Sequence, residues 1–260
     1  MYYEIYREIV RLAETGEEAS VATIISVEGS TPREEGAKML VYHNGRTLGT
    51  IGGGSLEKQV IQEALDVIKT SKTKKLSYRL SPQGELGMVC GGDTEVLIEP
   101  ITVAPRLFIF GAGHIGVPLA KMAALTDFKV VVIDDRPEFA TPERFPEASE
   151  LIVSDFSSVF EKITIAQGSF IVIITHGHKG DAVVLEGALK TPAKYIGMIG
   201  SKSKNEAVFG QLRAKGFTQD DIDRVCAPIG LKIRAQTPEE IAVSILGEMI
   251  EARRRVKIDE

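Results

Sequence analysis

The sequence predicts an α/β protein with two domains, an N-terminal α+β domain over residues 1–100 and a C-terminal domain with a parallel sheet over residues 105–260. In the first half, consecutive hairpin-like strands are flanked by helices, which is typical of α+β folds. In the second half, strands that are apolar almost throughout alternate with helices, which indicates a parallel sheet buried on both faces. Pro100 and Pro105 mark the junction where the pattern changes.

The composition is that of a globular protein and argues against several kinds of partner. The chain has 260 residues, of which 43% are hydrophobic, and a net charge of −5. The negative charge argues against nucleic acid or an anionic membrane as the main partner. No apolar run approaches the roughly 18 residues of a membrane span, and the charged, amphipathic start is unlike a signal peptide. Two cysteines form no disulfide framework, so we expect a cytoplasmic protein with reduced thiols.

Hydrophobic periodicity places the elements of the N-terminal domain. Apolar residues at helical spacing predict a helix over residues 2–15. The turn residues His43, Asn44 and Gly45 lie between two apolar runs and predict a hairpin over 37–51. A second helix is expected over 55–70, with an apolar face made of Leu56, Val60, Ile61, Leu65 and Ile68. Strands are expected over 20–29, 74–80 and 94–100.

Four apolar runs predict the strands of the C-terminal domain. They begin at Arg106, Phe128, Gly168 and Ala193, and helices are expected over 117–127 and around 180–190. The last helix has a clear start, because Thr237 is a good N-cap and Pro238 suits the first helical position. It ends in three arginines, which suit the negative end of the helix dipole.

A glycine loop follows the first of these strands and opens a helix. Gly111, Gly113 and Gly116 fit the pattern G-x-G-x-x-G, and Asp134 closes the next strand 23 residues after Gly111. This context predicts a Rossmann-like domain that binds a nucleotide-type ligand, with its pyrophosphate at the helix N-terminus. Asp134 or Asp135 is a candidate acceptor for ribose hydroxyls, which favours NAD, whereas Arg136 suits the 2′-phosphate of NADP. The alternative is that the glycines serve only the geometry of the fold.

Other candidates follow the later strands, where ligands of such sheets gather. His114 at the mouth of the loop and His176 are candidates for ligand contact, and these two with His178 are candidates for acid–base chemistry. Gly200 and Ser201, followed by two lysines, are a candidate anion site or a simple strand-end turn. His176, His178 and Asp181 are candidate metal ligands, although their spacing matches no standard zinc pattern and loop histidines without metal are the alternative. Cys226 is expected to be a small buried residue rather than a nucleophile.

Three more glycine-rich segments lie within the N-terminal domain. Gly52, Gly53 and Gly54 precede a helix and could cradle an anion, unless Ser55 simply caps that helix. Arg33 is a candidate for a phosphate contact or an ordinary surface arginine. Cys90, followed by Gly91 and Gly92, is a candidate for contact with a soft metal or a sulfur species, with burial as the alternative.

These segments together resemble the XdhC/CoxI family of xanthine dehydrogenase accessory or maturation factors. The resemblance runs in order through nearly the whole chain. It is carried by GSTPREEGAKMLV (29–41), GTIGGGSLE (49–57), GMVCGGD (87–93), GAGHIGVPLA (111–120), DDRPEFATPERFPEA (134–148), THGH (175–178), YIGMIGSKSK (195–204) and CAPIGLKIRAQTPEEIAVSI (226–245).

The resemblance implies a maturation factor rather than an enzyme that turns over purines. Such a protein binds the molybdenum cofactor, as molybdopterin or its dinucleotide form, assists its sulfuration, and delivers it to a molybdenum hydroxylase. It implies that Cys90 lies nearest the metal chemistry and that the glycine loops hold the ligand. A cysteine desulfurase is a further implied partner. Independently of the resemblance, an exposed apolar helix face is a candidate surface for a homodimer. The residues alone leave two other classes of protein as alternatives, an NAD(P)-dependent oxidoreductase and a nucleotide-sensing regulatory protein.

Overall fold

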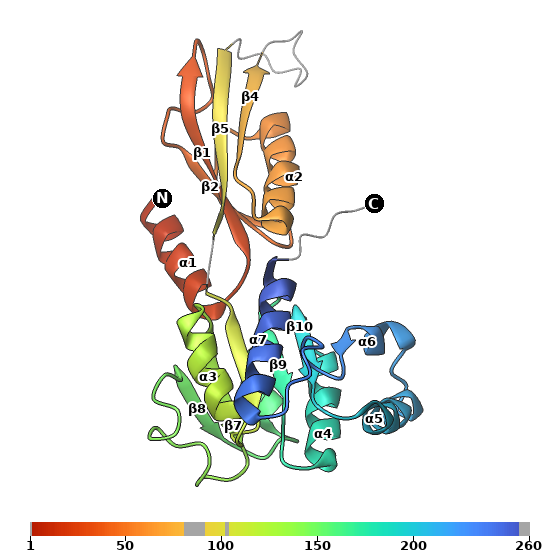
Figure 1. The fold of residues 1–260 in the computed structure, drawn as a ribbon. Helices are drawn as coiled ribbons and strands as arrows, with labels where there is room; N and C mark the ends of the chain where they lie inside the picture. Colours follow the sequence, from red (N-terminus) through yellow and green to blue (C-terminus); the bar gives the residue numbers. More distant parts are fainter. Residues whose placement is uncertain (1, 81–91, 102–103, 255–260) are drawn as a thin grey trace. The chain divides into compact units, whose positions relative to one another are not determined.

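The computed structural model describes residues 2–80, 92–101 and 104–254, which fold as two compact units (Figure 1). One unit ends at residue 103 and the other begins at Ala104. Each has its own sheet, an antiparallel one of five strands and a parallel one of six strands. The predicted fold class, an N-terminal α+β domain followed by a Rossmann-like domain, is confirmed.

The N-terminal unit contains the elements that the hydrophobic periodicity predicts. Its strands lie in the order β3-β2-β1-β5-β4. Gly45 has φ +80° and turns the hairpin between β2 and β3, as its sequence predicts. The elements are α1 (Tyr2–Thr15), β1 (Ala19–Glu28), β2 (Lys38–Tyr42), β3 (Thr47–Gly49), α2 (Gly54–Thr70), β4 (Lys74–Leu80) and β5 (Gly92–Ile101).

One helix packs on each face of this sheet. Because side chains alternate along a strand, Met39 and Val41 of β2 lie in the core under α2, and Leu40 and Tyr42 lie in the core under α1. The buried face of α2 differs in part from the predicted one: it consists of Leu56, Val60, Ala64 and Val67.

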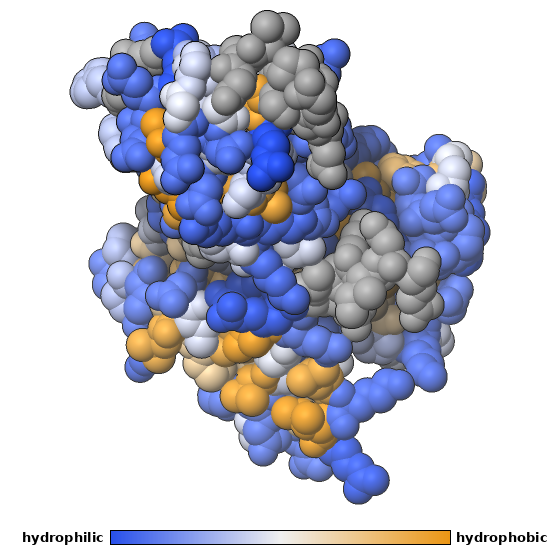
Figure 2. Space-filling view, turned by 90° about the horizontal axis from the view of Figure 1, so that it is seen from above, coloured by the Kyte–Doolittle hydropathy of each residue, from blue (hydrophilic) through white to orange (hydrophobic). Residues whose placement is uncertain are grey.

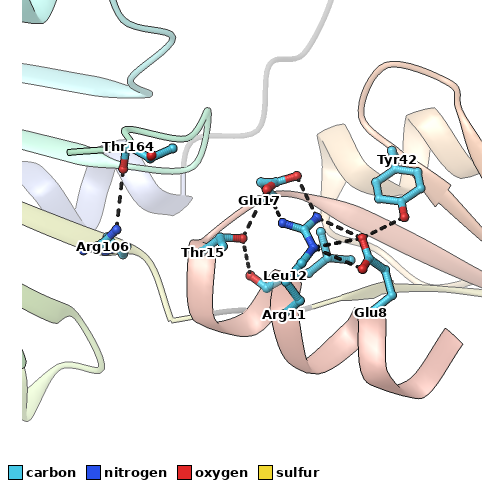
Figure 3. A network of polar contacts seen from close by, with 8 residues as sticks. All are labelled: Glu8, Arg11, Leu12, Thr15, Glu17, Tyr42, Arg106 and Thr164. Atoms are coloured by element: carbon cyan, nitrogen blue, oxygen red, sulfur yellow. Dashed lines mark hydrogen bonds and ion pairs between the residues drawn. The ribbon is translucent and has the colours of Figure 1, made fainter. Parts of the chain in front are cut away.

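A network of charges holds α1 in place (Figure 3). Arg11 donates to both Glu8 and Glu17, and Tyr42 of β2 donates to Glu8 at 2.8 Å. These bonds tie the helix to the start of β1 and to the sheet. Figure 3 also draws Arg106 of the C-terminal unit, whose guanidinium donates to the carbonyl of Thr164.

The C-terminal unit has the strand order β11-β10-β9-β6-β7-β8, and every pair in it is parallel. This is the doubly wound order in which the chain starts at the centre, moves to one edge, then returns and builds outward to the other edge. The elements are β6 (Arg106–Phe110), α3 (Gly116–Leu125), β7 (Lys129–Asp134), β8 (Glu150–Val153), η1 (Val159–Glu161), β9 (Phe170–Ile173), α4 (His178–Leu189), β10 (Tyr195–Met198), α5 (Lys202–Ala214), α6 (Gln219–Asp223), β11 (Val225–Cys226) and α7 (Pro238–Arg254).

Helices cover both faces of the parallel sheet, so its four central strands, β6, β7, β9 and β10, are almost entirely buried. Phe108 and Phe110 of β6 point into the core under α4 and α5, and Leu107 and Ile109 point into the core under α3 and α7. Helices α3 and α7 lie side by side (Figure 1). The strands β8 and β11 and the helix α6 are elements that the sequence did not predict. For α5, the sequence indicated only a lysine-bearing helix start, as the alternative to an anion site.

The face drawn in Figure 2 is mostly hydrophilic, and its hydrophobic residues form separate patches. Among the described helices, none is both long enough and apolar enough to cross a membrane.

Two helical glycines provide a matched test of the packing around α4. A Cβ at Gly187 would collide with the ring of Phe160, which is itself stacked on Phe110 with centroids 5.3 Å apart. A Cβ at Gly210 of α5 meets nothing within 4 Å. We expect Gly187→Ala to lower the free energy of unfolding by about 1–3 kcal/mol. Gly210→Ala should raise it by up to about 1 kcal/mol through helix propensity. Urea unfolding followed by circular dichroism measures both, and equal effects would contradict this packing.

Candidate functional site

The glycine loop between β6 and α3 lies at the carboxyl end of the central strand. Two of its three glycines are required by close packing. Gly111 has φ +119°, and a Cβ there would collide with the backbone carbonyl of Ile174 beyond β9. A Cβ on Gly116 would lie 2.5 Å from the carbonyl oxygen of Gly111. These two residues let the loop and the helix approach the sheet closely.

Gly113, unlike Gly111 and Gly116, faces open space, because a Cβ there would meet no atom within 4 Å. Within the described part of the chain, the backbone N–H groups of Gly113 and His114 donate no hydrogen bond. They lie just before α3, whose positive dipole end favours an anion. The His114 side chain is exposed beside them. This corner therefore has the donors and the open space that a phosphate needs.

Asp134, at the end of β7, fixes this loop. Its side chain is only 1% exposed, and Oδ2 accepts a 2.7 Å hydrogen bond from the N–H of Ala112. Arg136 donates to both carboxylate oxygens, from Nε at 2.8 Å and from Nη2 at 3.0 Å. Burial alone would raise the pKa of Asp134, but these donors outweigh it and lower the pKa. With the N–H of Arg136 as a fourth donor, the carboxylate has little capacity left for a ligand.

The neighbouring residues of this turn are more accessible. Asp135 is 48% exposed and lies 3.8 Å from Nε of Arg136. The guanidinium of Arg136 is centred 3.8 Å from the ring centroid of Phe139, and Arg144 lies over the same ring at 4.8 Å. Of the two predicted carboxylates, Asp135 is thus the one that solvent and ligands can reach.

The loop between β9 and α4 is fixed by Asp181. Its Oδ1 accepts from both the N–H and the hydroxyl of Thr175, at 3.1 and 2.6 Å. The His176 side chain is exposed. The His178 side chain lies outside the described part of the structure, so the predicted metal site stays a prediction. Among the residues that the structure does describe, no three His, Cys, Asp or Glu side chains form a group suited to a metal.

The loop between β10 and α5 carries the last of the predicted ligand residues. Gly200 has φ +145°, and a Cβ there would collide with Oδ1 of the buried Asn205. Ser201 is the N-cap of α5 and accepts a 3.4 Å bond from the N–H of Lys204. Ser201, Lys202 and Lys204 are exposed. The glycine thus has a structural role, and the polar residues after it face solvent.

Strand register brings all of these loops to one edge of the sheet. Phe110 of β6 lies opposite Ile133 of β7 and Ile173 of β9, and Ile173 lies opposite Met198 of β10. The next residues along each strand therefore emerge side by side. The predicted residues that share this edge are Gly111, Gly113, His114, Gly116, Asp134, Asp135, Arg136, His176, Gly200 and Ser201.

The same unit contains a polar network that no sequence pattern predicts. Tyr195 is 3% exposed, and its hydroxyl donates to Oε1 of Glu248 on α7 at 2.5 Å. The other oxygen of Glu248 accepts from the N–H of Gly230 at 3.1 Å. Burial, and then the adjacent carboxylate, raise the pKa of Tyr195. The network ties the chain beyond β11 to the last helix. Cys226 of β11 is half-buried and packs against the core under α3 and α7.

In the N-terminal unit, the side chain of Glu57 accepts hydrogen bonds from backbone N–H groups of the glycine loop. Its Oε1 accepts from the hydroxyl of Thr50 at 2.5 Å and from the N–H groups of Ile51 and Gly53, both at 3.0 Å. The N–H of Gly52 donates to Thr50. The N-cap of α2 is Gly53, so Ser55 does not cap this helix. The predicted anion cradle therefore already holds a carboxylate (a backbone nest with an internal anion).

Glycine lets three segments of the N-terminal unit meet. A Cβ on Gly52 would lie 2.9 Å from Pro32, and one on Gly92 would lie 2.5 Å from the carbonyl oxygen of Glu28. The loop of residues 28–33, which includes the exposed Arg33, thus contacts both glycine segments. Gly54 is exposed at the start of α2. Cys90 and Gly91, which the sequence selects as candidates, lie outside the described residues.

Comparison with protein families gives two matches that together span most of the chain. Residues 107–249 match the XdhC Rossmann domain, and residues 12–79 match the XdhC and CoxI family. The first match alone covers more than half of the chain. The protein belongs to the XdhC and CoxI family. The predicted resemblance is confirmed, and the two matched ranges contain every predicted site residue except Cys90, Gly91 and Gly92.

Relatives of known name are found over almost the full chain. The uncharacterized protein YqeB of Escherichia coli is 35% identical over 96% of this chain, which spans 46% of YqeB, about half its length. A probable xanthine dehydrogenase subunit of Bacillus subtilis is 26% identical over 95% of this chain and 97% of its own. The molybdenum cofactor insertion chaperone PaoD of Escherichia coli is 20% identical over 96% of this chain and 88% of its own.

A crystal structure described as a xanthine dehydrogenase from Bacillus halodurans is similar in fold. It is 28% identical, covers 98% of this chain and 97% of its own, and has a TM-score of 0.53. This chain and that solved structure therefore share a similar fold over almost their full lengths.

The Glu57 contacts predict an acid-sensitive N-terminal unit. Burial opposes ionisation of Glu57, but the donors from Thr50, Ile51 and Gly53 outweigh it and hold the pKa below its ordinary value of 4.5. The carboxylate therefore contributes stability above about pH 4.5, and this contribution is lost as pH falls through the lowered pKa. We expect Glu57→Gln to lower the free energy of unfolding by about 1–3 kcal/mol at pH 7. The difference in the free energy of unfolding between the wild type and Glu57→Gln should become smaller as the pH falls.

The control is Glu63→Gln on the same helix, which removes one carboxylate from an exposed ion pair with Lys74. Its cost should stay below about 1 kcal/mol. Urea unfolding between pH 3 and 7 measures both variants. A Glu57→Gln deficit that does not change with pH would show that the carboxylate charge plays no part.

Proposed function

We propose that this chain binds the molybdenum cofactor and assists its insertion into a xanthine dehydrogenase-type molybdenum hydroxylase. Family membership and the relative named as a molybdenum cofactor insertion chaperone support the type of function. The open anion corner at Gly113 supports ligand binding by this chain. It has free N–H donors, a helix dipole and space above a residue without a side chain.

The residues at this edge fit the phosphate end of such a ligand. The N–H groups of Gly113 and His114 would donate to the phosphate, and the exposed Ser201 and Lys202 add a hydroxyl and a positive charge on the same edge. Bound to its enzyme, the cofactor supplies the molybdenum chemistry; this chain's part is to hold and release it. Glycine at position 113 lets the backbone approach the anion.

Assistance in sulfuration is the second part of the proposal, and it rests on Cys90. A thiolate is a ligand that molybdenum and transferable sulfur both accept. Cys90 lies within the family-like segment GMVCGGD, and a cysteine desulfurase would be the source of the sulfur. The chain has only two cysteines, fewer than the four thiolates that hold an iron–sulfur cluster. Xanthine dehydrogenase activity of this chain itself is therefore not proposed.

A second candidate function is an NAD(P)-dependent oxidoreductase. It is favoured by one observation, the doubly wound strand order with G-x-G-x-x-G at its centre. A nucleotide-sensing regulator would use the same site without chemistry. Nicotinamide binding and hydride transfer would distinguish the oxidoreductase from the regulator. Neither of these two alternatives predicts molybdenum in the purified protein.

Gly113→Val tests the binding proposal. The side chain would fill the open corner and cover the donors while meeting no protein atom at Cβ. We expect the wild-type protein, purified without oxygen from cells that make the cofactor, to contain molybdenum and pterin. The variant should contain at least tenfold less of both, with an unchanged melting temperature. Molybdenum is measured by mass spectrometry and pterin by fluorescence after oxidation.

Gly210→Val is the matched control, because Gly210 also lies in open space but far along the chain on α5. It should retain the wild-type molybdenum content. Wild-type protein free of molybdenum and pterin, or equal loss in both variants, would contradict the proposal.

Cys90→Ser tests the sulfuration step separately. We expect the variant to bind the cofactor as the wild type does, because serine keeps the size of the side chain but lacks the thiolate. A co-expressed hydroxylase should then contain molybdenum but several-fold less cyanide-releasable sulfur and activity. If the hydroxylase co-expressed with Cys90→Ser is fully sulfurated, Cys90 has no part in sulfuration. The proposal that this chain binds the cofactor would be unaffected.

A further inference from the structure

An exposed apolar patch lies on the loop after β11 and on α7, against which this loop packs. Its members are Leu231, Ile233 and Val243, which are 39%, 52% and 50% exposed. A Cβ on Gly247 of α7 would lie 2.8 Å from Cδ1 of Leu231, and Val243 is one turn before Gly247 on the same helix face. The N–H of Ile233 donates to the carbonyl of Leu231. Large apolar side chains that gather at one exposed place mark an interaction site.

The loop that carries this patch is fixed on α7. The N–H of Leu231 donates to the carbonyl of Ser244 at 3.1 Å, and the hydroxyl of Ser244 donates to the carbonyl of Leu231 at 2.7 Å. The N–H of Gly230 donates to Glu248, and Arg234 has φ +62°, in the left-handed region. A surface whose backbone is already ordered loses little entropy when a partner binds to it.

Positive charges border the patch. Lys232 and Arg234 lie on either side of Ile233 in the chain, and both are exposed. Lys202 and Lys204, which follow the neighbouring strand β10, are exposed as well. Among the residues that the structure describes, none of these four cations forms an ion pair.

The acids of the same loops and helix starts do not balance these cations. Glu240 accepts a 2.7 Å bond from the N–H of Gln236, and Glu206 lies 3.7 Å from Arg213, whereas Glu239 is exposed. The patch is therefore apolar at its centre and positively charged at its border. Its complement is an apolar protein surface bordered by carboxylates. A second copy of this chain is a poor complement, because two-fold symmetry would bring the same cations together.

The patch lies at the edge of the sheet where the ligand is proposed to bind. The N–H of Ile229, two residues before the patch, donates to the carbonyl of Met198 at the end of β10. The loop therefore leaves the sheet at its carboxyl edge, which also carries Gly113 and Ser201. A protein that receives a ligand from this edge has to dock beside it.

We infer that the patch of Leu231, Ile233 and Val243, with Lys232 and Arg234 at its border, is the docking surface for the hydroxylase that receives the cofactor. The hydroxylase contributes an apolar surface bordered by carboxylates. The inference rests on the proposed function for the identity of this partner, and adds the surface that binds it.

Biolayer interferometry tests the inference, with the cofactor-free hydroxylase from the same organism immobilised and the full chain in solution. We expect Ile233→Ser to weaken binding at least fivefold, because it removes apolar contact area. The double variant Lys232→Glu, Arg234→Glu should weaken binding at least tenfold. Raising the salt concentration from about 0.1 M to about 0.5 M should weaken wild-type binding several-fold, and that of the double variant less.

Matched controls lie on α3, away from the patch. Leu125→Ser removes a side chain that is 78% exposed, and Lys121→Glu reverses an exposed charge. Both variants should bind the hydroxylase as the wild type does. All the variants should keep the wild-type melting temperature and the wild-type content of molybdenum and pterin, because none of them changes the corner at Gly113.

The two measurements fail separately, since cofactor content tests the proposed function and hydroxylase affinity tests this surface. Wild-type affinity in both patch variants, or no binding by the wild type, would overturn the inference. A wild-type dimer that Ile233→Ser converts to a monomer in light scattering would overturn it in favour of a second copy. Binding to vesicles of phosphatidylglycerol and phosphatidylcholine that the double variant loses would overturn it in favour of a lipid surface.

Discussion

The buried carboxylate of Asp134 is the interaction on which the carboxyl edge of the parallel sheet depends. A carboxylate that is 1% exposed is unstable unless donors surround it. Here the donors are the guanidinium and N–H of Arg136 and the N–H of Ala112. Removing one partner of such a buried pair commonly costs about 3–5 kcal/mol. The position of the glycine loop and the orientation of Arg136 are therefore set by one residue at the end of β7.

Much of this fold could be predicted because buried apolar residues recur in the sequence at the spacing of a helix or a strand. The central strands are runs of apolar residues, and their order along the chain indicated a parallel sheet. Strand β8 was missed because it is an edge strand whose residues are exposed or half-buried, and β11 was missed because it has only two residues. The buried face of α2 was placed only in part, since Ala64 is small enough to be overlooked among larger apolar neighbours.

The hydrogen-bond and ion-pair partners of buried polar residues were much harder to predict from the sequence. Tyr195 and Glu248 are 53 residues apart, and nothing in either local sequence indicates their bond. The two acids at the end of β7 looked equivalent in the sequence, yet folding buries Asp134 and exposes Asp135. Sequence patterns report which residues are buried, whereas the partner of a buried charge depends on the tertiary structure. The position of these residues at one edge of the parallel sheet could therefore be predicted, but which of them are buried and what they contact could not.

The two glycine-rich loops look similar in sequence and differ in what their backbones bind. At Gly113 the N–H groups are open, whereas at Gly52 and Gly53 they are satisfied within the chain. Glu57 is the fourth residue of α2, and its side chain folds back over the turn that precedes it. The internal carboxylate does for this loop what a bound anion does for others. The N–H groups of Ile51, Gly52 and Gly53 thus have partners within the chain itself, and this turn needs no external anion to keep its conformation.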